Sequence, residues 1–241
     1  MSGQAPYRQG EAVAYVAAAV EHQLRLICHE PDDSLTIAGE FVLSAYRDAW
    51  VALSGGSVLA IDPDADQESP HAARQLIENT DHYAVLLILL ARVCLHEGKE
   101  RLAWRLFALN KMLHGLNVSP NVRLPRRFRI AHCVGTVIGR ADLGDRLFVS
   151  HGCTIGASSA AEYPRLGSGV SLMANRAVLG RCSIGDEVVI GTGVRLINSD
   201  VPSGTLVVMG SSGAELIPSE FPRRHSIRVF GPYAPASAPS L

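Results

Sequence analysis

The sequence predicts an α+β protein in which an N-terminal α-helical domain precedes a parallel β-helix of hexapeptide repeats. Aliphatic residues recur every six positions at Leu166, Leu172, Val178, Ile184, Ile190 and Leu196, and glycine often follows them. A helix repeats at three to four residues and a half-buried strand at two, so a period of six is typical of a β-helix with three hexads per triangular coil. The first half of the chain has helical spacing instead.

The six-residue period also extends upstream, where Val137, Leu143, Val149 and Ile155 continue it. We expect all of these aliphatic side chains to point into the prism. The interval from Ile155 to Leu166 is eleven residues, so one hexad carries an insertion of about five. A coil that continues unaltered has no need of a loop, and we therefore look for chemistry there.

The spacing of apolar residues before position 116 predicts four helices. Their expected ranges are 11–29, 35–53, 71–97 and 99–114, with Gly115 as the last stop. The acidic stretch 61–69 contains Pro63 and is expected to be a loop. The predicted domains are therefore a helical domain over 1–116, a β-helix over 117–217 and a C-terminal tail over 218–241.

The tail ends in a segment of mostly Pro, Ala and Ser, a composition that buries too little surface to order itself. We expect it to be flexible; the alternative is a peptide, ending at Leu241, that docks into a partner.

Composition excludes several classes of partner. A formal net charge of −1 argues against nucleic acid and against an anionic membrane surface. The five cysteines form no CxxC pair and lie in apolar stretches, which indicates buried free thiols. No basic-then-apolar leader opens the chain, so we expect a cytoplasmic protein.

Four segments resemble the serine acetyltransferase family. Asn117-Val118-Ser119-Pro120 is similar to the family's Asp-Ile-His-Pro, and Ala131 to Gly139 (AHCVGTVIG) is similar to its Asp-His-Ala-Thr-Gly-Ile-Val-Val-Gly. Glu162-Tyr163-Pro164-Arg165-Leu166 resembles Arg-His-Pro-Lys-Ile, and Val201-Pro202 resembles the Val-Pro that closes the last coil. The resemblance implies a left-handed parallel β-helix, a CoA-dependent O-acyltransferase activity, and a homotrimer or dimer of trimers.

The same alignment shows departures at the residues that would grip serine. Asn117 and Ala131 stand where the family has aspartates, and Glu162 and Tyr163 stand where it has an arginine and a histidine. The loop is also three residues shorter. A site for zwitterionic serine needs charges of both signs, and their loss removes the main source of discrimination. We therefore expect the acceptor to be a small-molecule hydroxyl compound, with serine one possibility beside serine-like metabolites.

His132 matches the family's catalytic histidine and is the predicted general base, since imidazole titrates near neutral pH. The alternative is an ordinary histidine at a β-helix corner. Asn117 could orient its ring through the amide oxygen. His151 follows nineteen residues later, close to one coil of about eighteen, so it should stack near the same corner or else lie exposed on a neighbouring face.

Further substrate and cofactor residues come from matching positions alone. Tyr163 and Glu162 would contact the acceptor, although Tyr163 could simply pack. Asp62 and Asp66 lie in the acidic stretch where the family carries an acceptor-binding acid; the alternative is a solvated loop. For acetyl-CoA the matching small residues are Gly156, Ala157, Ser158, Ala174, Gly191 and Thr192. Tight β-helix corners require small residues too.

Two other functions stay open at this point. The segment His151 to Gly156 (HGCTIG) resembles the zinc-ligand segment of γ-class carbonic anhydrases, but catalytic zinc needs three protein ligands. The position of that family's partner histidine holds Arg146, so we expect no metal. The second alternative is a non-catalytic relative that acts as a scaffold or regulatory protein.

Overall fold

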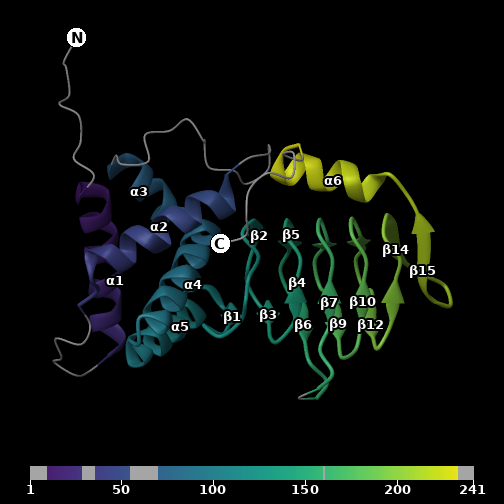
Figure 1. Ribbon diagram of the computed structural model, residues 1–241, viewed down its shortest axis with the longest axis horizontal. Helices are drawn as coiled ribbons and strands as arrows, with labels where there is room; N and C mark the ends of the chain where they lie inside the picture. Colours follow the sequence, from purple (N-terminus) through teal and green to yellow (C-terminus); the bar gives the residue numbers. More distant parts are fainter. Residues whose placement is uncertain (1–9, 29–35, 55–69, 160, 233–241) are drawn as a thin grey trace, which may run out of the picture.

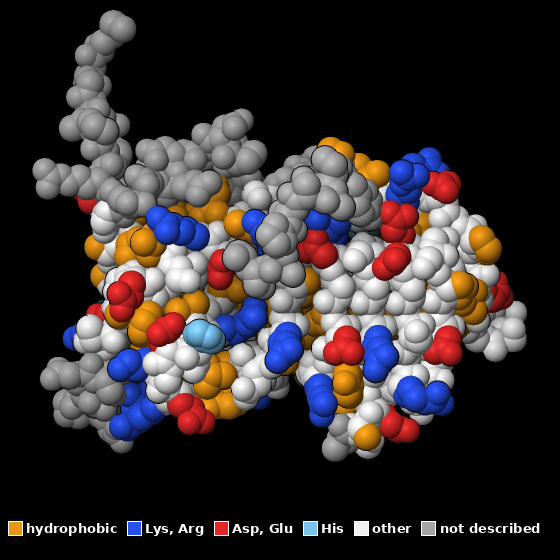
Figure 2. All heavy atoms as spheres, viewed as in Figure 1, with side chains coloured by type: hydrophobic (Ala, Val, Ile, Leu, Met, Phe, Trp, Pro, Cys, Tyr) orange, Lys and Arg blue, Asp and Glu red, His pale blue; other side chains and the backbone are white. Residues whose placement is uncertain are grey.

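The computed structural model describes residues 10–28, 36–54, 70–159 and 161–232. Helices gather at one end of the molecule and a parallel β-helix extends from them, with a further helix along its side (Figure 1). Basic and acidic side chains are interspersed over the face shown in Figure 2. Among the described helices none is long and apolar enough to span a bilayer.

In the described ranges before residue 117, five helices precede the first strand. They are α1 (Gly10–Ile27), α2 (Gly39–Leu53), α3 (Pro70–Glu78), α4 (Thr80–His96) and α5 (Glu100–His114). The prediction of a single helix over 71–97 is therefore wrong, because the helix is interrupted at Asn79. Its side chain accepts hydrogen bonds from the backbone N–H groups of Asp81 and His82 and so caps a new helix.

The β-helix has three sheets whose strands alternate along the chain. The first contains β1 (Asn117–Val118), β3 (Val137–Ile138), β6 (Thr154–Gly156), β9 (Ala177–Leu179) and β12 (Arg195–Ile197). The second contains β4 (Asp142–Leu143), β7 (Arg165–Leu166), β10 (Ser183–Ile184) and β13 (Asp200–Val201). The third contains β2 (Phe128–Ile130), β5 (Leu147–Val149), β8 (Ser171–Leu172), β11 (Val189–Ile190), β14 (Thr205–Gly210) and β15 (Gly213–Pro218).

The parallel register stacks the inward aliphatic side chains of successive coils. One such stack is Ile138, Ile155, Val178 and Leu196, all buried. The prediction is wrong at Val137, which is 37% exposed, because Ile138 is the inward residue of that strand. The reason is the following corner, because Ile138 and Leu143 are five positions apart, whereas Leu143 and Val149 are six apart.

The helical domain closes the N-terminal end of the prism. Helices α2 and α4 contact β2, and α5 contacts β1. A single cluster of buried apolar residues runs from α1 into the last coils, so the two parts share one hydrophobic core. The helical domain therefore covers the open end of the β-helix that would otherwise meet water.

The C-terminal end differs from the flexible tail expected from 218. After the antiparallel hairpin of β14 and β15, helix α6 (Phe221–Phe230) returns along the β-helix (Figure 1). Val229 and Phe230 pack on Phe148 of β5 and on Ala131. The buried Arg146 donates to the carbonyls of Ser226 and Gly231. These contacts order a segment whose polar composition gave little sign of a helix.

Helix α6 carries a buried histidine that makes its packing depend on pH. His225 is 7% exposed and lies against the rings of Phe148 and Phe221. Burial, and then the Arg228 charge, lower the pKa of His225 below its ordinary value. The unfolded chain binds a proton below about pH 6.5 and the folded chain resists it, so this contribution to stability is present above about pH 6.5 and is lost on acidification.

We therefore predict that acidification from pH 7.5 to 5.5 loosens α6. Hydrogen exchange of peptides covering 221–230, corrected for the intrinsic rate, should become faster at pH 5.5. The effect should disappear in His225→Phe and persist in His96→Gln, which changes an exposed histidine. Equal pH dependence in wild type and His225→Phe would contradict the prediction.

Candidate active site

His132 lies at the corner between β2 and β3, in the first coil. Its backbone has φ of 54°, in the left-handed region that few non-glycine residues adopt. The N–H of His132 donates to Asp81 Oδ2 at 2.8 Å, and the N–H of Cys133 donates to Asp81 Oδ1 at 3.2 Å. The turn is thus held from the helical domain, and the His132 side chain is exposed.

His151 occupies the same corner one coil later. Its ring centroid lies 6.3 Å from that of His132, with the two planes at 63°. The structure therefore brings these two predicted residues together. Two neighbouring imidazoles can accept and donate protons, which is the chemistry of general acid–base catalysis.

Asn117 is placed beside this corner without joining the pair. It begins β1, pairs in register with Val137, and donates its backbone N–H to the carbonyl of Thr136 at 2.9 Å. Within the described part of the chain, its side chain makes no hydrogen bond to His132. The orienting role expected for its amide is therefore absent from this arrangement of one chain.

The loop residues Glu162 and Tyr163 lie at the corner beyond the opposite end of the strands of the five-stranded sheet. Ser158 binds Glu162 through both its backbone N–H and its hydroxyl, each at 3.0 Å. The Arg140 guanidinium lies over the Tyr163 ring at 4.3 Å from the centroid. Glu162 and Tyr163 follow β6 in the chain, whereas His151 precedes it. Strand β6 has three residues, roughly 10 Å, and separates the two groups within one chain.

A cavity opens beside Tyr163. Its volume is about 800 Å³, and Tyr163, Arg140 and Arg123 line it together with Ser119 and Asn121. Its two arginines give the cavity cationic groups suited to a carboxylate or phosphate.

Comparison with known proteins places the chain in a family, although no family model matches it. The serine acetyltransferase of Helicobacter pylori strain 26695 is 32% identical over 150 residues, which span 59% of this chain and 86% of that protein. The enzyme of Staphylococcus xylosus is 30% identical over 149 residues, spanning 58% and 68% respectively. This chain belongs to the serine acetyltransferase family.

Solved structures agree on the fold. The serine acetyltransferase of Neisseria gonorrhoeae superposes with a TM-score of 0.62 at 24% identity, covering 88% of this chain and 80% of that one. A serine acetyltransferase in complex with CoA gives 0.61 at 17% identity, covering 84% and 85%. The family to which the chain belongs is named for acetyl transfer to serine, and the bound CoA is that of the second solved structure.

The positions matched to the family's CoA groove fall on two different corners. Ala174, Gly191 and Thr192 continue the corner of His132 and His151 in the next coils, since Leu172 and Ile190 stack on Val149. Gly156, Ala157 and Ser158 lie instead at the corner where the loop begins. A Cβ at Gly191 would come within 2.7 Å of the Val207 carbonyl oxygen. Internal packing alone therefore requires glycine at 191.

Two of the predicted substrate-binding residues cannot be placed in this geometry. Asp62 and Asp66 lie outside the described residues. Among the described residues there is no group of three His, Cys, Asp or Glu side chains that could hold a metal ion. Arg146, at the position of the carbonic anhydrase histidine, is buried under α6.

Two residues at the site were missed by sequence reasoning. Asp81 is 51 positions before His132 and contacts it only in the folded chain. Arg140 follows the matched segment Ala131 to Gly139 directly, so this neighbour of Tyr163 could have been noticed.

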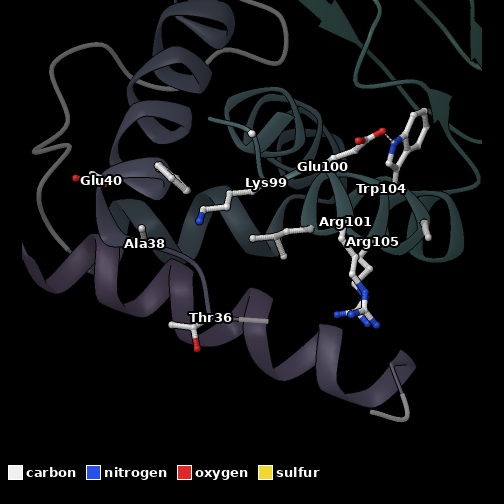
Figure 3. Close-up of a pocket in the computed structure, with 12 residues that line it drawn as sticks. Thr36, Ala38, Glu40, Lys99, Glu100, Arg101, Trp104 and Arg105 are labelled. Atoms are coloured by element: carbon white, nitrogen blue, oxygen red, sulfur yellow. Dashed lines mark hydrogen bonds between the residues drawn. The ribbon is translucent and has the colours of Figure 1, made fainter. Parts of the chain in front are cut away.

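A larger cavity lies away from this family's site. It has a volume of about 1150 Å³ between α5 and the segment around Thr36, and none of the predicted site residues lines it. Figure 3 shows Lys99, Arg101 and Arg105 around it, with the Trp104 indole donating to Glu100 at 3.5 Å.

Proposed function

We propose that this chain transfers the acetyl group of acetyl-CoA to the hydroxyl of serine or of a serine-like small metabolite. The observation that carries the proposal is the pair of imidazoles of His132 and His151, 6.3 Å apart at one corner. The pair lies in a chain of the serine acetyltransferase family. A hydroxyl group is a weak nucleophile at neutral pH and needs such a base.

In the proposed mechanism, a ring nitrogen of His132 takes the proton of the acceptor hydroxyl. The hydroxyl oxygen attacks the thioester carbon of acetyl-CoA at the same time. The carbon–sulfur bond then breaks, and the imidazolium returns the proton to the departing thiolate. Transfer is direct, with no covalent acyl-enzyme. The ring of His151 lies next to that of His132, and its proposed role is to hold the acceptor hydroxyl beside the base.

The charges of the site support a serine-like acceptor whose contacts differ from the family pattern. Serine carries a carboxylate and an ammonium group, and the loop arginine and histidine of the family are Glu162 and Tyr163 here. Arg140, stacked on Tyr163, supplies a positive charge at this loop from another chain position. Glu162 supplies a negative one. The acceptor is therefore expected to keep both charged groups of an amino acid.

A complete site is proposed to need a second copy of the chain. Three apolar side chains are exposed on or beside the five-stranded sheet, namely Val134 at 67%, Val137 at 37% and Ile197 at 56%. A face of this kind is typical of a protein interface. We propose a homotrimer in which the loop of one subunit approaches the His132 corner of the next, with the helical domains able to pair trimers into hexamers.

The five free thiols fit a cytoplasmic location.

The first test is an acceptor panel. Purified protein with acetyl-CoA and amino acids or alcohols that carry a hydroxyl should release free CoA thiol, fastest with an acceptor that has both a carboxylate and an ammonium group. L-Serine is the reference, and alanine and glycine are the controls without a hydroxyl. Thiol release with no acceptor above the hydrolysis rate would contradict the proposed function.

The second test removes the base. His132→Ala should lower kcat at least about a hundredfold, the usual contribution of general base catalysis, while acetyl-CoA binding measured by calorimetry persists. His96→Ala, an exposed histidine of the helical domain, is the matched control and should keep full turnover. Intact turnover in His132→Ala would exclude the mechanism.

The third test asks whether the site spans two subunits. His132→Ala and Tyr163→Ala proteins should each have low activity alone. After they are unfolded and refolded together, interfaces with a native His132 on one side and a native Tyr163 on the other should restore roughly a quarter of the sites. Native mass spectrometry verifies mixing. Mixed trimers without regained activity would show that the two residues do not act across an interface.

A further inference from the structure

Asp81 is placed at the start of helix α4 with its carboxylate directed at the β-helix. Asn79 caps α4 and accepts the backbone N–H of Asp81 at 3.1 Å. Both carboxylate oxygens of Asp81 accept hydrogen bonds from the turn of His132 and Cys133. Asp81 is only 9% exposed, so these two charge-assisted bonds are shielded from water.

The turn needs such a partner because, among the described residues, the N–H groups of His132 and Cys133 donate to no backbone carbonyl. In later coils the corner N–H groups donate to the coil before: Gly152 donates to the carbonyl of Val134 at 3.0 Å, and Asn175 to that of His151 at 2.8 Å. The N–H at the same place in this corner is that of Gly135, which donates to the carbonyl of Gly115 at 3.0 Å, so the Asp81 carboxylate binds two further N–H groups of the turn. The corner also spans eight residues between inward positions where the later coils have six, so regular stacking alone does not fix its shape.

We infer that Asp81 is a positioning residue for the proposed reaction: its carboxylate holds the left-handed turn of His132 so that the imidazole stays beside that of His151. The inference rests on the proposed role of His132 as the base. The chain has Asn117 and Ala131 where its family resemblance leads one to expect acids. Among the described residues, Asp81 is the carboxylate that binds this turn.

The consequence is a loss of turnover rather than a loss of substrate binding. Displacing a catalytic group by about 1 Å can cost on the order of a hundredfold in rate. Asp81→Ala should therefore lower kcat by about tenfold or more, with KM for acetyl-CoA changed less than about twofold. Asp81→Asn keeps one acceptor oxygen and should fall between Asp81→Ala and wild type.

Asp145 offers a matched structural control. Its carboxylate also accepts a backbone N–H, from Arg127 at 2.8 Å, and binds the Arg127 guanidinium, but at another corner of the same coil. Asp145→Ala should lower thermal stability and leave kcat unchanged. A fall in kcat equal to that of Asp81→Ala would mean that destabilisation alone explains both, and would overturn the inference.

A second readout does not depend on activity. Hydrogen exchange at the amides of His132 and Cys133 should accelerate in Asp81→Ala and Asp81→Asn but not in Asp145→Ala. Unchanged exchange, or unchanged kcat in an active enzyme, would overturn the inference. A wild-type protein without turnover on any acceptor would instead contradict the proposed function, while exchange would still report whether Asp81 holds the turn. If Asp81→Ala does not fold, Asp81→Asn carries the same comparison.

Discussion

The register between successive coils is the constraint on which the rest of the structure depends. Each inward aliphatic side chain must lie on the one from the coil before, as Ile155 lies between Ile138 and Val178. A slip of one residue would turn every inward side chain outward. Extra residues are therefore accommodated only at corners, where they do not disturb the stack. The two intervals that are longer than six, before Ile138 and before Leu166, are both at corners, and both carry proposed site residues.

The exposed end of the first coil of a β-helix must also be covered by another part of the chain. The helical domain does this with apolar side chains and with polar contacts. Arg129 of β2 donates to the carbonyl of Ser54 at 3.3 Å, and Asp81 accepts from the first corner. The helices thus bind donors of β2, which is the end strand of its sheet, and of the first corner. Because that coil carries His132, the fold of the helical domain and the geometry of the proposed base are linked.

Local patterns predicted much of this, because hexads and helical spacing are properties of neighbouring residues. The approach of His151 to His132 followed from the length of one coil. The patterns failed where distant contacts decide the structure. Arg146 and Phe148 order a polar segment into α6. The helix predicted over 71–97 missed a local signal instead, because the Asn79 side chain caps α4. The contact of Asp81 with His132 has no local signal, since it depends on how α4 meets the first coil.

The loss of acids at positions 117 and 131 does not by itself remove a carboxylate from the site. A general base needs a fixed position and suitable charges around it. Residues from any part of the sequence can meet both requirements if the fold brings them to the base. Position 131 precedes the base directly, 117 lies on the adjoining strand β1, and 81 reaches the turn from α4. Three chain positions therefore converge on one corner. In this chain the carboxylate at 81 binds the turn, so the family pattern could change at 117 and 131 while an acid stayed in contact with the His132 turn.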